Sequence, residues 1–210
     1  ARRQGRNDEG MTVLKEAEAV FRQLRAQGDD SEPTRLGLAN ALGYQAAILI
    51  GQLKVEEAIG FGEAALAEIR PLVEGASRPS ARALREYGET LTGLGYATAN
   101  FGDARKSMEY LRKSQEVFRQ LGAPKAADLS IDAGYASATA WLASALDSAD
   151  QRTEARAKYE ESLGVANRIL DAMPGHATGL HVKGLALSSL TEMDIVDLRI
   201  AKGLVRAKEN

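Results

Sequence analysis

The chain has 210 residues, of which 44% are hydrophobic and 27% charged, and its formal net charge is −2. This balance excludes general disorder and gives no basic field that would attract nucleic acid or an anionic membrane. The absence of cysteine excludes disulfides and thiolate metal sites and suits a cytoplasmic protein. Strong helix formers predominate and there are only 5 prolines, so the composition predicts an all-α fold.

The sequence is expected to contain neither a targeting signal nor a boundary between domains. Residues 1–8 carry charge without a following apolar segment, so we predict a disordered leader or linker rather than a signal peptide. No stretch approaches the roughly 20 uninterrupted apolar residues that a membrane span needs. No linker is long enough to divide the remainder, so residues 9–207 are predicted to form a single domain.

Apolar residues recur at helical spacing from residue 9 onward. The opening helix contains Ala17 and Phe21 and is predicted to be the second half of an incomplete hairpin. A later helix begins after Asp103, which can cap its first turn, and ends at Gly122 and Pro124. In chain order, we predict helices at 9–27, 34–51, 54–74, 80–101, 103–121, 125–148, 151–172, 176–191 and 194–207.

Three of the predicted helix pairs share a motif. An anchor on the first helix is followed 16 residues later by a small residue on the second, as in Leu42 and Ala58, Leu91 and Ser107, and Thr139 and Ala155. Four residues after each anchor stands a small residue, which allows the two helices to approach closely; these residues are Ala46, Gly95 and Ala143. The motif repeats with a period of 49 and then 48 residues.

These pairs resemble tetratricopeptide (TPR) repeats, although the period exceeds the roughly 34 residues of that family. The resemblance implies antiparallel helix hairpins stacked as an α-solenoid, with the first helices lining a concave surface that binds another protein or peptide. The residues predicted on that surface are mostly small and polar, with Tyr96 and Asn100 at the centre. They are Asn40, Ala47, Glu89, Thr92, Tyr96, Asn100, Ser137, Ala140, Ser144, Asp147 and Ser148.

No motif indicates catalysis, since the chain has no Walker loop, HExxH or G-x-S-x-G sequence. His176 and His181 would lie about 140° apart on a helix, so they do not form a metal-binding pair. Trp141 is interpreted as packing between neighbouring hairpins, with an anchor in the binding surface as the alternative. We therefore expect no enzymatic activity, no cofactor and no metal.

The leading hypothesis is a protein- or peptide-binding adaptor or scaffold in the cytoplasm, with neither nucleic acid nor membrane as a partner. The alternative is a self-association or regulatory spacer domain cut from a larger signalling or regulatory protein, with a homodimer formed through the ends of the array. The composition, rich in alanine and arginine, is typical of bacteria with GC-rich DNA. A peptide bound to a monomeric array would distinguish the two hypotheses.

Overall fold

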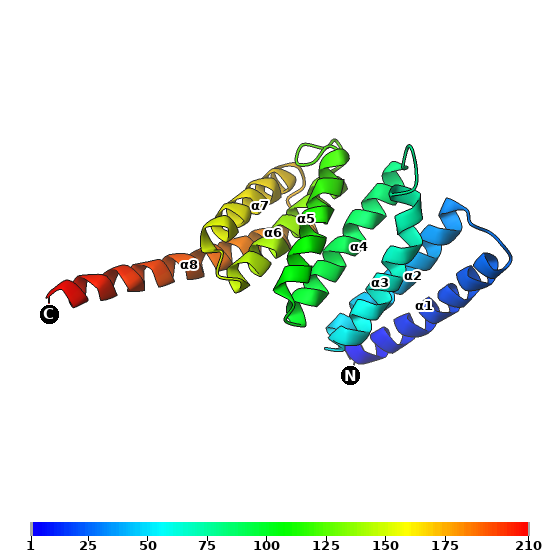
Figure 1. The fold of residues 1–210 in the computed structure, drawn as a ribbon, viewed down its shortest axis with the longest axis horizontal. Coiled ribbons are helices and arrows are strands. Elements are labelled where there is room, and N and C mark those ends of the chain that lie inside the picture. The colour runs from blue at the N-terminus through cyan, green and yellow to red at the C-terminus, as the bar shows by residue number, and fades with distance from the viewer. Residues whose placement is uncertain (1, 210) are drawn as a thin grey trace.

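The computed structural model describes the backbone of residues 2–209 and the side chains of residues 7–199. Over that range it contains α-helices and no strand, which confirms the all-α prediction (Figure 1). The helices are α1 (Arg2–Ala26), α2 (Glu32–Gly51), α3 (Val55–Val73), α4 (Ala81–Asn100), α5 (Ala104–Gln120), α6 (Leu129–Ser148), α7 (Arg152–Ala172) and α8 (Ala177–Glu209). Within the described part of the chain, no helix combines the length and apolarity required to cross a membrane.

The helices are arranged as three hairpins flanked by α1 and α8. Turns of three residues join α2 to α3, α4 to α5 and α6 to α7, and the helices of each pair pack along each other. The even-numbered helices α2, α4, α6 and α8 also pack against one another in that order, whereas among the described residues α3, α5 and α7 do not. The even-numbered helices therefore form a layer of their own. We call its outer surface, which carries Asn40, Tyr44, Glu89, Tyr96 and Trp141, the even-helix face.

The hydrophobic core lies between the two layers and repeats with the hairpins. Each anchor of the sequence motif and the small residue opposite it are at most 2% exposed, in the pairs Leu42 and Ala58, Leu91 and Ser107, and Thr139 and Ala155. A Cβ atom built on Gly95 of α4 would lie only 2.4 Å from Cγ of Leu111 on α5. The predicted contact between these two residues is confirmed, and it requires glycine at position 95.

Phe118 of α5 occupies the junction of three helices. Its side chain is fully buried, and its ring lies against Gly88 of α4 and Gly134 of α6. A Cβ atom on either glycine would come within 3.0 Å of the ring. A single phenylalanine therefore joins the second hairpin to the third.

The two ends of the chain differ from the prediction. Helix α1 begins at Arg2, whereas the sequence predicted that the first helix would begin at residue 9. Helix α8 is continuous where two helices, 176–191 and 194–207, were predicted. Its middle contains no glycine or proline, and Asp194 and Asp197 form ion pairs with Arg156 of α7, which hold this part of α8 in place.

The connections between hairpins are longer than predicted. Residues 74–80 and 121–128 take up part of the long period, and α6 begins at Leu129 rather than at 125. The Asp128 carboxylate accepts a hydrogen bond from the Ser130 backbone, and Asp132 accepts one from the backbone of Ala126. These bonds stabilise a turn in place of a further turn of helix.

Replacing Asp103 by alanine should lower the free energy of unfolding by about 1 kcal/mol. The Asp103 carboxylate accepts a hydrogen bond from the Lys106 backbone nitrogen at 2.9 Å and so satisfies an unpaired donor at the start of α5. Urea denaturation measures the difference. Asp103→Asn is the control and should retain most of the stability, because asparagine also caps helices. Equal loss in both variants would contradict the capping role.

Candidate functional site

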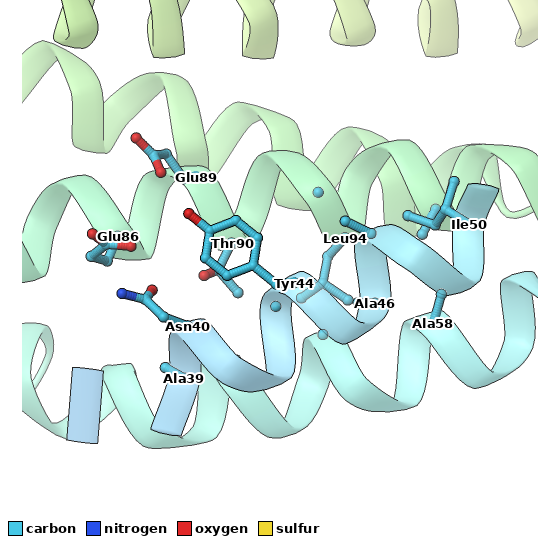
Figure 2. Close-up of a pocket in the computed structure, with 15 residues that line it drawn as sticks. Ala39, Asn40, Tyr44, Ala46, Ile50, Ala58, Glu86, Glu89, Thr90 and Leu94 are labelled. Carbon is cyan, nitrogen blue, oxygen red and sulfur yellow. The ribbon is translucent and has the colours of Figure 1, made fainter. Parts of the chain in front are cut away.

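A pocket of about 240 Å³ opens on the even-helix face between α2 and α4, with α3 below it (Figure 2). One end of the pocket is polar and the other apolar, and Tyr44 stands between them. The polar end is formed by Asn40, Glu86, Glu89 and Thr90, and the apolar end by Ala46, Ile50, Ala58, Gly62, Leu94 and Ala97. Such a cavity fits a side chain that has an apolar stem and a polar head.

The polar end carries two carboxylates on neighbouring turns of α4. Burial and the nearby Glu86 raise the pKa of Glu89 above its usual value. Arg85 is the charged neighbour of both, and its guanidinium nitrogens lie 3.9 Å from Glu86 and 4.0 Å from Glu89. These distances are too long for hydrogen bonds, so both carboxylates retain free acceptor capacity among the described residues. An acid held with a raised pKa beside a cavity is typical of functional sites.

Tyr44 is the most exposed aromatic residue at the pocket, with 64% of its surface accessible. A second, shallower depression continues from it over α1 and α2, and Tyr44 and Ala47 line both hollows. Glu9 and Val13 of α1 border this second depression. The two hollows together form a continuous surface that crosses α1, α2 and α4.

The pocket lies where small residues occupy positions that carry large aromatic side chains in the following repeat. At the interface between α4 and α6, the rings of Tyr96 and Trp141 pack with their centroids 4.4 Å apart. At the interface between α2 and α4, one period earlier in the sequence, the same positions are occupied by Ala47 and Gly93. Both of these small residues line the pocket. The space that two aromatic rings fill in one interface is therefore open in the other.

Aromatic side chains continue across the even-helix face beyond the pocket. Trp141 of α6 lies between Tyr96 of α4 and His181 of α8, whose ring centroid is 6.0 Å away. Trp141 is partly buried against the core and thus packs between neighbouring hairpins, as predicted. These rings form one wall of the face and give it rigidity.

The structure brings together three of the residues predicted at the binding surface, since Asn40, Ala47 and Glu89 all line the pocket. Of the two residues predicted at the centre of the surface, Tyr96 belongs to the aromatic stack, and Asn100 is exposed at the end of α4 with its amide donating to the Tyr96 carbonyl. The residues predicted on α6 lie outside the pocket: Ser137, Ser144, Asp147 and Ser148.

Two predicted surface residues face the protein interior instead. The Thr92 hydroxyl lies 2.8 Å from that of Ser114 on α5, because Thr92 is rotated about 60° from Glu89 around the helix. Ala140 is fully buried in the core. The sequence reasoning missed Tyr44, Glu86 and Gly93. The signal that could have found Tyr44 and Gly93 is their repeat position, because Tyr44, Gly93 and Trp141 are equivalent.

Other types of site find little support in the described residues. They contain no group of three or more side chains that could hold a metal ion. His176 accepts a hydrogen bond through Nδ1 from the backbone nitrogen of Gly179 at the start of α8, and His181 belongs to the aromatic row. The pocket is thus the feature from which a function can be argued.

Comparison with known proteins relates the chain to others by fold alone. The sequence matches no model of a protein family, and it matches no curated protein. Among solved structures, it is similar to the crystal structure of BtubC (BKLC) from P. vanneervenii, with a TM-score of 0.60 and 14% sequence identity. The match covers 90% of this chain and 68% of that chain. At this identity the similarity extends to the course of the helices and not to function.

Proposed function

We propose that this chain is a protein- or peptide-binding module of the TPR-like α-solenoid type, and that it acts as an adaptor or scaffold rather than an enzyme. The even-helix face is its concave, partner-binding surface. The observation that carries the proposal is the pocket between α2 and α4, where small residues take the positions that the aromatic pair occupies between α4 and α6. A cytoplasmic, bacterial setting is consistent with the composition and belongs to the proposal.

The depth and shape of the pocket support a polypeptide ligand. A cavity of about 240 Å³ accommodates a side chain rather than a large cofactor, and the shallower depression beside it extends the contact surface over α1. Peptide-binding surfaces commonly combine one buried anchor with a longer, shallower track. Tyr44 lines both hollows, and its rigid amphipathic ring can contact a peptide that is bound along them.

The double substitution Ala47→Tyr with Gly93→Trp should close the pocket without unfolding the protein. It copies the Tyr96 and Trp141 pair of the next interface, and a Cβ atom on Gly93 meets nothing within 4 Å. The probe is a phage-displayed library of random dodecapeptides. We expect wild type to enrich a set of peptides, and the closed variant to bind them at least about tenfold more weakly by fluorescence polarisation, a loss of about 1.4 kcal/mol.

Gly60→Trp with Ala67→Tyr, on exposed positions of α3, is the matched control and should bind like wild type. Circular dichroism establishes that both variants are folded. Undiminished binding by the folded closed variant would move the site away from this pocket. A wild-type protein that enriches no peptide would contradict the proposed function itself.

Self-association is the second candidate function, and one observation favours it. Leu180, Leu187 and Leu198 of α8 are each at least 45% exposed and lie on one side of the helix, opposite the buried Met193. Exposed apolar stripes of this kind are typical of helix–helix interfaces. Sedimentation of wild type and of Leu187→Asp distinguishes this function from peptide binding, because only a dimer formed through α8 would dissociate.

A further inference from the structure

We infer that the pocket between α2 and α4 recognises a basic side chain, lysine or arginine, of a bound polypeptide. This inference rests on the proposed function and specifies the chemistry of its anchor. The polar end of the pocket combines Glu86 and Glu89 with the exposed ring of Tyr44, and the apolar end leads to Leu94 and Ile50 (Figure 2). Lysine and arginine carry a long apolar stem and a cationic head, which match the two ends.

Charge complementarity decides between a basic anchor and a neutral one. Glu86 and Glu89 together carry two negative charges when ionised, and Arg85 supplies one positive charge at 3.9 and 4.0 Å. A net negative charge therefore remains at the mouth of the pocket. Lys and Arg heads also bind to the face of a tyrosine ring, and Tyr44 presents its ring there. An acidic side chain would be repelled, and a purely apolar one would leave the carboxylates desolvated without a partner.

The state of Glu89 supports a role in binding. Partial burial and the neighbouring Glu86 raise its pKa, while 52% of its side chain remains accessible to a ligand. A cation in the pocket would offset this shift, because an opposite charge favours the ionised form. Among the residues that line the shallower depression, Glu9 carries a charge and it is also negative. A segment with a basic anchor and further basic or polar residues fits this path.

The test compares charge on both sides of the contact. Peptides are selected from the random dodecapeptide library on wild-type protein, and the basic residue common to the selected peptides is then replaced by norleucine, which keeps the apolar stem and removes the charge. We expect the norleucine peptides to bind wild type at least about tenfold more weakly. Glu86→Gln with Glu89→Gln should weaken the basic peptide by a similar factor and bind both peptides equally.

Glu109→Gln with Glu116→Gln, on exposed positions of α5, is the matched control, since it removes the same charge from the opposite layer. It should bind like wild type. Equal binding of basic and norleucine peptides by wild type would overturn the inference, as would an equal loss of both peptides in the Glu86 and Glu89 variant.

The same experiment separates this inference from the proposed function. Selected peptides that lack basic residues, yet lose binding when Ala47→Tyr and Gly93→Trp close the pocket, would overturn only the basic anchor. Peptides that bind the closed variant as tightly as wild type would overturn the basic anchor and move the binding site away from this pocket, whereas a wild-type protein that enriches no peptide would contradict the proposed function. Enrichment of basic peptides whose binding is lost in the closed variant and in the Glu86 and Glu89 variant supports both.

Discussion

Phe118→Ala should lower the free energy of unfolding by about 3 to 5 kcal/mol, a large share of the roughly 5 to 15 kcal/mol that stabilises a typical domain. The Phe118 ring is fully buried and contacts helices of two hairpins, at Gly88 of α4 and Gly134 of α6. Both glycines have no side chain that could move into the space, so the cavity cannot collapse. Urea denaturation followed by circular dichroism measures the loss.

Phe101→Ala is the matched control, because the same ring is removed from a side chain that is 58% exposed in the turn after α4. We expect its effect to stay within about 0.5 kcal/mol. If the two variants were equally stable, Phe118 would not join the second and third hairpins as the structure indicates.

Gly95→Leu should destabilise the protein by about 1 to 3 kcal/mol or more, since it forces apart two helices that touch through a glycine. A Cβ atom at this position would already lie 2.4 Å from Leu111, which is itself fully buried and has no room to move. Separating the helices also breaks the hydrogen bond that Ser107 Oγ donates to the Gly95 carbonyl at 2.7 Å. Thermal melting measures the effect.

Gly93→Leu is the control on the same helix, two residues away. A side chain there meets nothing within 4 Å, and leucine is a better helix former than glycine, so this variant should be as stable as wild type or slightly more stable. An equal melting temperature for the two variants would show that the helices do not approach through Gly95.

The three hairpins could be predicted because their cores repeat locally in the sequence. Leu91 and Ser107, like their equivalents, are buried at the positions that apolar periodicity and small-residue spacing predicted. The continuity of α8 could not be predicted in this way. It depends on contacts with α7, such as the ion pair of Asp194 with Arg156, which a pattern read along one helix does not contain.

The binding surface was predicted only in part, for a geometric reason. The prediction assigned the same face of α2, α4 and α6 to the binding surface. Asn40, Ala47 and Glu89 from that face do line one pocket, but the prediction took the interfaces between these helices to be alike. The pocket arises from a difference between interfaces, namely the missing rings at Ala47 and Gly93. A comparison of equivalent repeat positions, rather than of helix faces, reveals it.

The unequal packing of these interfaces also determines where the molecule can bend. Helices α4 and α6 are braced by the packed rings of Tyr96 and Trp141, whereas the contact between α2 and α4 is bordered by an open volume of about 240 Å³. Close-packed contacts resist deformation, and a void removes them. We therefore expect the row of helices to flex more readily between the first and second hairpins than between the second and third. A ligand side chain bound there would fix the angle between these two hairpins, so that ligand binding would set the curvature of the whole module.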